Sequence, residues 1–237
     1  MQYPLTAVSG YWKIPNKHGN AFMDWFKTCL RINCPYVFFG TAETIAIAKT
    51  FRADLPTHYI ELALTDFYMQ RYYDDIVTHP AHCPSKELNM IWNEKLFLIQ
   101  RAAALNPFGS DFFSWIDAGI CTYRGKMPPE APFPNPAKLV GLPTDKLIFT
   151  SSEERIFNPH AITNTDYQHY VSGTTYAIHR TFIDRFVEQF AIYLQKFLPM
   201  RCNIFTDQVI LTYMYKDYPG LFHKLGHGYG ELLPLLY

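Results

Sequence analysis

The sequence has few charged residues and no local excess of either sign. Lysine and arginine together number 21, as do aspartate and glutamate, so the formal net charge is zero and charged residues make up only 18%. Binding to double-stranded nucleic acid requires a basic face, and no dense cluster of lysine and arginine occurs along the chain. The composition therefore argues against a nucleic-acid partner, although a single nucleotide remains a suitable ligand.

The chain also lacks cysteine pairs, a targeting segment and long apolar runs. Its five cysteines are odd in number and include no Cys-x-x-Cys pair. No apolar run approaches the roughly 18 residues that a membrane-spanning helix requires. The first residues lead directly into an expected strand, which leaves no room for a targeting segment. We therefore expect a soluble, cytoplasmic protein with reduced thiols and no integral membrane segment.

Two common sequence patterns, one for zinc binding and one for serine hydrolases, are missing as well. His79, His82 and Cys83 lie close together, but no fourth ligand follows at the interval of a zinc finger. No Gly-x-Ser-x-Gly nucleophile elbow occurs either. Neither a zinc site nor a serine hydrolase is expected.

Hydrophobic and aromatic residues are abundant, at 49% and 17% of the 237 residues. This length suits one large α/β domain. The aromatic content exceeds what a core of this size usually needs, so part of it is expected to line a cleft. A core that is simply rich in phenylalanine, with tyrosines at its rim, is the alternative.

Strand and helix patterns alternate through residue 117, which predicts a mainly parallel sheet flanked by helices. The expected strands are 6–12, 36–39, 58–62 and 111–117, and the expected helices are 20–31, 41–52, 66–75 and 85–106. Two further strands (146–149 and 171–178), two helices (180–197 and 207–215) and a glycine-rich tail are expected to follow. Residues 126–144 are rich in proline, which indicates a functional loop rather than a domain boundary.

The clearest functional signal is the strand that ends in Asp117. This carboxylate follows largely apolar residues and precedes Ala118 and Gly119. Ligands bind at the carboxyl ends of strands in open α/β sheets, and a carboxylate there can hold a ribose hydroxyl or a divalent cation that bridges a diphosphate. Gly119 permits close approach of a ligand. The alternative is that Asp117 only caps a turn.

The run Asn-Pro-Phe-Gly-Ser-Asp-Phe-Phe-Ser-Trp-Ile-Asp-Ala-Gly-Ile at residues 106–120 resembles the central motif of the HtrL/WlaTC-like glycosyltransferases of bacteria and viruses. Members carry this block after a helix with a lysine, here Lys95. The resemblance implies a GT-A fold in a single domain 1–237, with a nucleotide-sugar half (1–125) and a smaller acceptor half (126–237). It implies a hexosyl- or deoxyhexosyltransferase of glycan biosynthesis. Such an enzyme moves a sugar from a nucleoside diphosphate donor, expected to be UDP-linked, to a glycan hydroxyl.

The resemblance also implies where the donor binds. The base is expected over the end of the first strand, where Tyr11 or Trp12 can stack on it, although packing is the alternative for both. Lys95 or Arg124 is expected to meet the diphosphate, and Arg52 is a further candidate. The full set of expected donor-binding residues is Val8, Ser9, Gly10, Tyr11, Trp12, Lys95, Asp117, Ala118, Gly119 and Arg124.

Metal use stays open at this point. GT-A enzymes usually carry Asp-x-Asp, whereas Gly119 takes the third position here. One expectation is that His223, in a C-terminal His-x-x-Gly segment that would fold over the donor as a lid, joins Asp117 in binding Mn²⁺ or Mg²⁺. The other is that a basic residue such as Arg124 replaces the cation.

Asp207 is the leading catalytic candidate. With Gln208 it resembles the Asp-Gln pair that begins a late helix in many GT-A enzymes. A carboxylate there can act as the general base for the acceptor hydroxyl, whereas the alternative is an acidic residue favoured by the helix dipole. Residues 172–175 resemble the acceptor-side strand. The other possible bases are Glu153, Glu154 and Asp166. The rival function is a catalytically silent nucleotide- or glycan-binding module with the same fold.

Overall fold

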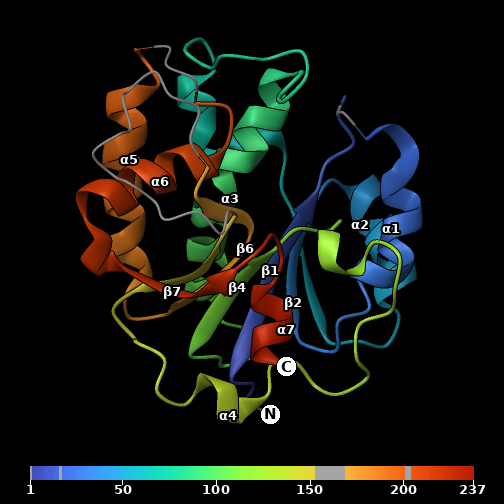
Figure 1. The fold of residues 1–237 in the computed structure, drawn as a ribbon. Coiled ribbons are helices and arrows are strands. Elements are labelled where there is room, and N and C mark those ends of the chain that lie inside the picture. Colours follow the sequence, from blue (N-terminus) through green and yellow to red (C-terminus); the bar gives the residue numbers. More distant parts are fainter. Residues whose placement is uncertain (1, 16–17, 153–168, 201–203) are drawn as a thin grey trace.

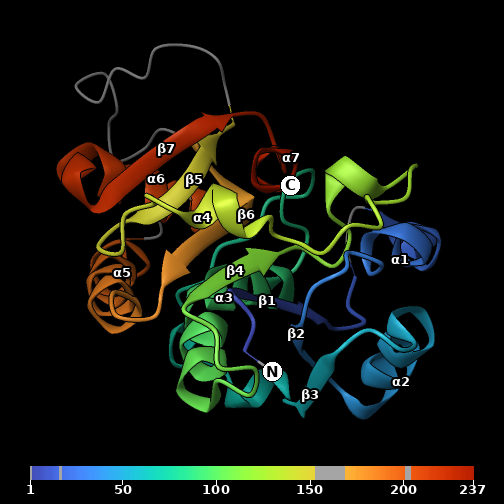
Figure 2. The same ribbon diagram turned by 90° about the horizontal axis from the view of Figure 1, so that it is seen from below.

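The computed structural model describes residues 2–15, 18–152, 169–200 and 204–237, which form a single sheet covered by helices (Figure 1). The strands are β1 (Leu5–Tyr11), β2 (Tyr36–Gly40), β3 (Thr57–Glu61), β4 (Phe112–Ile116), β5 (Leu147–Ser151), β6 (Val171–His179) and β7 (Phe222–His227). Their order is β3-β2-β1-β4-β6-β5-β7, which Figure 2 shows from edge to edge. Four of the six pairings are parallel, and β6 runs antiparallel to both of its neighbours, β4 and β5.

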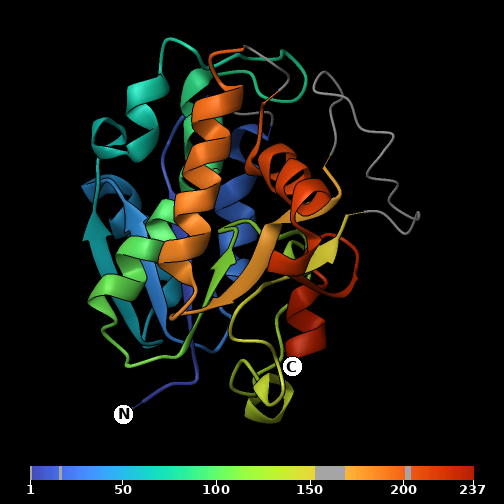
Figure 3. The same cartoon turned by 90° about the vertical axis from the view of Figure 1, so that its left-hand side faces the viewer.

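Helices cover both faces of the sheet, which explains why β2 and β4 are largely apolar and have every residue buried. The helices α3 (Lys86–Leu105), α5 (Ile183–Phe197) and α6 (Asp207–Asp217) pack on one face. Figure 3 shows α3 and α5 side by side in front of the sheet. The helices α1 (Phe22–Cys29), α2 (Ala42–Arg52) and α7 (Leu232–Leu236) pack on the other face. The predicted α/β layering is confirmed.

Helix α3 supplies a central residue of the site, and its ends agree with the sequence. The Ser85 hydroxyl accepts a hydrogen bond from the backbone N–H of Leu88 at 3.2 Å, which caps the first turn. Asn106 ends the helix in the left-handed conformation, with φ +37°. Both ends lie where the pattern 85–106 predicts them.

Two elements differ from expectation. Residues 66–75 do not form an α-helix; the 3₁₀ turns η2 (Leu64–Asp66) and η3 (Tyr68–Tyr72) occupy this region. The glycine-rich C-terminal tail contains two regular elements that were not expected, β7 and α7. Strand β7 pairs only with β5 and lies at the edge of the sheet, where lysine and histidine are tolerated. Its sequence therefore lacks the apolar run of a central strand.

The proline-rich loop does not lie at the expected ligand edge. Its short helix α4 (Pro136–Leu139) lies near the chain termini, at the end of the sheet where β1 begins (Figure 1). The backbone N–H of Phe133 donates to Asn33, and that of Asn135 donates to Leu236. The loop thus closes the end of the sheet opposite the carboxyl ends of β1 and β4.

None of the helices described is both long and apolar enough to cross a membrane. Four cysteines in the described ranges are free thiols, and Cys202 lies outside those ranges.

Candidate functional site

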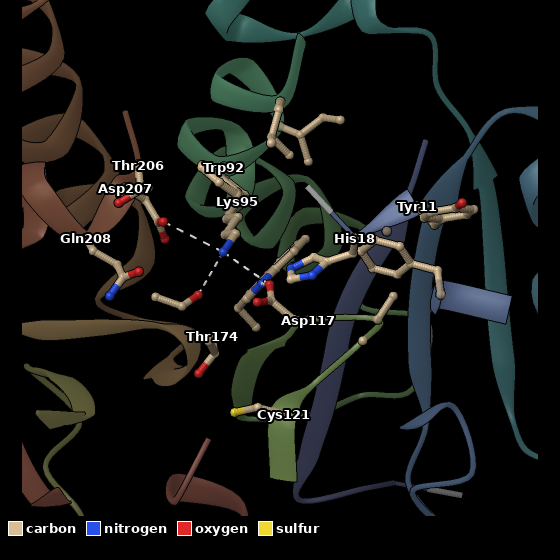
Figure 4. Close-up of a pocket in the computed structure, with 18 of the residues that line it drawn as sticks. Tyr11, His18, Trp92, Lys95, Asp117, Cys121, Thr174, Thr206, Asp207 and Gln208 are labelled. Atoms are coloured by element: carbon tan, nitrogen blue, oxygen red, sulfur yellow. Dashed lines mark hydrogen bonds and ion pairs between the residues drawn. The ribbon is translucent and has the colours of Figure 1, made fainter. Parts of the chain in front are cut away.

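A cavity of about 510 Å³ opens at the carboxyl ends of β1 and β4 (Figure 4). Its size suits a small organic ligand, and its position is the one at which open α/β sheets bind ligands. The antiparallel strand β6 brings a second group of residues to the same edge, because Ile116 pairs with Thr175 and the Asp117 N–H donates to the Thr174 carbonyl at 3.0 Å. The start of α6 adds Thr206, Asp207 and Gln208 to the lining.

Lys95 lies at the centre of this cavity, between two carboxylates (Figure 4). Its Nζ lies 3.1 Å from Oδ1 of Asp117 and 3.7 Å from Oδ1 of Asp207, and it donates to the Gly173 carbonyl at 2.8 Å. The side chains of Lys95 and Asp207 are 4% and 2% exposed, whereas that of Asp117 is 30% exposed. Asp117 is therefore the charged member that an entering ligand meets first.

The electrostatics of this triad follow from burial. Burial raises the pKa of the Asp207 carboxyl to about 7, although the positive charge of Lys95 opposes that shift. Burial lowers the pKa of Lys95, but the two carboxylates outweigh it and hold that pKa above its usual value. Tyr176, whose hydroxyl lies 3.5 Å from Oδ2 of Asp207, also has a raised pKa through burial and that carboxylate. Burial and the neighbouring charges therefore favour the cationic form of Lys95 and disfavour the ionised form of Asp207.

The turn after β4 is shaped by α1. Trp115 Nε1 donates to Oδ1 of Asp117 at 2.7 Å, which fixes that carboxylate. A Cβ atom at Gly119 would lie 2.8 Å from Cε3 of Trp25 and 3.0 Å from Cε1 of Phe22. A side chain at this position, including the second carboxylate of an Asp-x-Asp motif, would therefore require the aromatic rings of α1 to move.

Arg124 lines the cavity and is held in place by the same turn. Its Nε donates to the Gly119 carbonyl at 2.8 Å, and its guanidinium carbon lies 3.8 Å from the centroid of the Trp25 ring. Within the described part of the chain, its two terminal nitrogens donate no hydrogen bond.

The end of β1 contributes fewer residues than predicted. Gly10, Tyr11 and Trp12 line the cavity, but Val8 and Ser9 do not, because they are fully buried between β2 and β4. Trp12 is itself almost fully buried, and its Nε1 donates to the Leu62 carbonyl at 2.9 Å. Tyr11 is half-buried against α1 and is the aromatic residue of β1 best placed for a ligand.

Arg52 does not reach the cavity, contrary to expectation. It is fully buried, and its guanidinium donates to the backbone carbonyls of Leu30, Ile32 and Cys34 at 2.7–3.0 Å. It also stacks on the Tyr36 ring. Arg52 therefore ties the α1–β2 connection to α2, and its donors are consumed by that contact.

His223, which was expected to join Asp117 in binding a metal ion, lies away from the cavity. It lies at the start of β7, beside Ile148 of β5, and does not line the cavity. The C-terminal segment reaches the cavity through Tyr229 instead. The Cys121 thiol donates to the Tyr229 carbonyl at 3.2 Å, and the Thr122 hydroxyl donates to the Gly230 carbonyl at 3.0 Å.

The residues present do not fit a preformed site for Mn²⁺ or Mg²⁺. Within the ranges described, no three His, Cys, Asp or Glu side chains gather where they could hold a metal ion. At Asp117, the oxygen Oδ1 already accepts from Trp115 and faces the Lys95 ammonium. Hard divalent cations prefer several oxygen ligands, and among the described residues this edge of the sheet offers one accessible carboxylate. Glu153, Glu154 and Asp166 lie outside the described residues.

Several lining residues were not predicted. Trp92 lies three positions before Lys95 on α3, so helical spacing places both on one face and was a usable signal. Leu88 and Ile91 lie on the same helix. Several others lie in loops or at element ends that carry no pattern, among them His18, His82, Cys121, His169 and Tyr229. Thr174 was expected only as part of the acceptor-side strand.

Comparisons with known proteins agree with this architecture. The family model described as "Bacterial protein of unknown function (HtrL_YibB)" matches residues 44–233. No curated protein sequence matches the chain.

Solved structures similar to the chain include the following two. The apo form of mouse Xyloside xylosyltransferase 1 has a TM-score of 0.54 at 10% identity, over 93% of this chain and 84% of that one. The 4-diphosphocytidyl-2C-methyl-D-erythritolsynthase from Anaerococcus prevotii has a TM-score of 0.39 at 12% identity, over 94% and 87%. The first likeness confirms the predicted GT-A-like α/β fold. With the family match, it also confirms the resemblance seen in residues 106–120, and the chain belongs to the HtrL/YibB family.

Proposed function

We propose that this protein is a glycosyltransferase that moves a sugar from a nucleoside diphosphate donor, UDP-linked in this proposal, to a hydroxyl of a glycan acceptor. The observation that supports it most directly is the Lys95–Asp117–Asp207 triad at the carboxyl ends of β1 and β4. The fold shared with a xylosyltransferase supports the same class of reaction. In this proposal, residues 1–125 form the donor half and 126–237 the acceptor half of one cytoplasmic domain.

The cavity has two ends that suit the two ends of such a donor. Tyr11 and His18 lie on one side of Asp117, whereas Asp207 and Gln208 lie on the other (Figure 4). In this proposal the base stacks on the Tyr11 side and a ribose hydroxyl donates to the Asp117 carboxylate. The sugar then extends past Lys95 toward the start of α6.

The transfer step needs a base and a stabilised leaving group. The acceptor oxygen bonds to the anomeric carbon, the bond from that carbon to the diphosphate oxygen breaks, and the diphosphate leaves with the electron pair. Asp207 is the proposed base for the acceptor proton, because a pKa of about 7 suits proton transfer near neutral pH. Lys95 stabilises the charge that develops on the diphosphate, and the cavity walls orient both substrates.

One observation favours a second candidate, a binding module of the same fold without turnover. The Asp207 side chain is only 2% exposed and faces Lys95, so an acceptor must displace part of this contact before a proton can move. A silent module would bind the donor and leave it intact, which separates the two functions experimentally.

Thermal denaturation with UDP, GDP, CDP, ADP and dTDP tests the donor site. A ligand at 100 times its Kd stabilises a protein by about 2.7 kcal/mol, which corresponds to a rise in Tm of about 5–10 °C for a chain of this size. We expect such a rise with one nucleoside diphosphate and a smaller one with its nucleoside. If no nucleotide raises Tm, the proposal is wrong. Release of nucleoside diphosphate from the matching sugar nucleotide then separates an enzyme from a silent module.

A further inference from the structure

The turn from Asp117 to Arg124 forms one packed unit with α1. Because position 119 has no side chain, the Trp25 ring lies against the backbone there. The same ring supports the Arg124 guanidinium, whose Nε is bonded to the Gly119 carbonyl. The Trp25 ring therefore occupies the space that a second acidic side chain would need, and the same ring supports Arg124.

Arg124 is placed before any ligand arrives. Stacking on Trp25 and the hydrogen bond from Nε fix the plane of the guanidinium, and the residue lines the cavity. Its terminal nitrogens, which donate to no described residue, remain available as a fork. Arginine donors in this arrangement match phosphate oxygens in a bidentate way, and little side-chain entropy is lost on binding.

Lys95 disfavours a metal ion at the other side of the site. Its ammonium lies 3.1 Å from Oδ1 of Asp117 and already neutralises this carboxylate, the accessible one among the described lining residues. A divalent cation bound to the same oxygen would have to displace this ammonium and the Trp115 indole, both of which already contact Oδ1. Lys95 is held there by the Gly173 carbonyl and by Asp207 as well.

From these contacts we infer that the site binds the diphosphate of its donor without a divalent cation, with Arg124 and Lys95 supplying the positive charge. This inference rests on the proposed function, since it specifies how the proposed donor is held. It corresponds to the second expectation for position 119, in which a basic residue replaces the cation.

Isothermal titration calorimetry with UDP, or with whichever nucleoside diphosphate gives the largest thermal shift, tests the inference. The protein is stripped of metal and titrated in EDTA and, separately, in Mn²⁺. We expect affinities within about twofold of each other. Arg124→Gln should weaken diphosphate binding at least tenfold in EDTA and should change the affinity for the matching nucleoside less than twofold.

Arg180→Gln is the matched control. Arg180 forms an exposed ion pair with Asp111 at the start of β4, at the end of that strand opposite the cavity, so its loss should leave binding unchanged. Arg124→Lys keeps the charge but loses the fork, and should fall between wild type and Arg124→Gln.

The outcomes separate this inference from the function on which it rests. Binding that appears only with Mn²⁺ overturns the inference and leaves the glycosyltransferase proposal intact. Loss of nucleoside and diphosphate binding together in Arg124→Gln also overturns it, because the arginine would then only shape the turn. If no nucleoside diphosphate binds in either buffer, both proposals are wrong.

Discussion

Gly173 of β6 lies directly against the carboxylate of Asp207. A Cβ atom at Gly173 would lie 2.7 Å from Oδ1 and 3.0 Å from Oδ2 of Asp207, and 2.6 Å from Cγ of Gln208. The start of α6 can therefore approach β6 only because this strand position has no side chain. The Gly173 carbonyl accepts a hydrogen bond from Lys95, so Gly173 helps to position both Lys95 and Asp207.

Gly173→Ala should destabilise the protein and displace Asp207. Overpacking of a tight contact typically costs about 1–3 kcal/mol, and urea denaturation measures that cost. Gly125→Ala is the control, because a Cβ at Gly125 meets nothing within 4 Å. Equal stability of the two variants would show that α6 shifts away from the strand at no cost.

Lys95→Met should be among the most destabilising single substitutions in the cavity. It leaves the carboxylate of Asp207 buried without its cation, and breaking a buried pair typically costs about 3–5 kcal/mol. Adding Asp207→Asn should restore part of that loss. Lys27→Met, which removes only the exposed pair with Asp24, should cost under about 1 kcal/mol. If chemical denaturation gives the same midpoint for both single variants, the buried ion pairs of Lys95 contribute no more to stability than the exposed pair of Lys27, and the prediction is wrong.

Asp207→Asn should change how stability depends on pH. The folded pKa of about 7 lies above the ordinary value of 3.8, so the stability that this group contributes is complete below pH 4 and is lost as pH rises through 7. Unfolding free energies measured from pH 4 to 8 should therefore fall more steeply for wild type than for the variant. The buried Glu94, whose pKa is also raised to about 7, has the same sign and preserves part of the slope in the variant. Parallel profiles would mean that Asp207 is ionised throughout this range.

The same variant tests the proposed base. Loss of a general base typically lowers turnover by about 10²–10⁴-fold. Release of nucleoside diphosphate by Asp207→Asn should fall accordingly, while nucleotide affinity changes less than about threefold. Unchanged turnover would remove Asp207 from the role of base.

Arg52→Met should unfold more easily yet bind nucleotide normally. The substitution leaves several buried carbonyls without a donor, and each typically costs about 1–3 kcal/mol. The thermal shift produced by the best nucleotide should match that of wild type. If Arg52→Met is folded but nucleotide no longer raises its Tm, Arg52 contributes to the donor site after all.

The parts of this fold that sequence predicts best are those that local pattern determines. Strands β2 and β4 are recognisable because both of their faces are covered, and Asp117 is recognisable because a polar residue follows such a strand. Strand β7 is missed because it lies at the edge of the sheet and needs few apolar residues. Lys95 and Asp207 were each singled out, but not as a pair.

The pairing of Lys95 with Asp207 depends on the direction of β6. These residues are 112 positions apart, and they meet because β6 runs antiparallel to β4 and delivers Gly173 to the same edge. Arg52 illustrates the opposite error, since nothing in its sequence context distinguishes a buried arginine that binds carbonyls from one that binds phosphate. Tertiary contacts of this kind leave no trace in periodicity.

The packing of Trp25 against Gly119 constrains how this protein can evolve. An aspartate at position 119 requires a smaller residue at position 25, and that second replacement removes the support beneath Arg124. An aspartate at position 119 made alone would meet the Trp25 and Phe22 rings, and a smaller residue at position 25 made alone would leave Arg124 unsupported and the Asp-x-Asp motif incomplete. A second carboxylate at position 119 and a fixed arginine at position 124 are therefore competing uses of one turn.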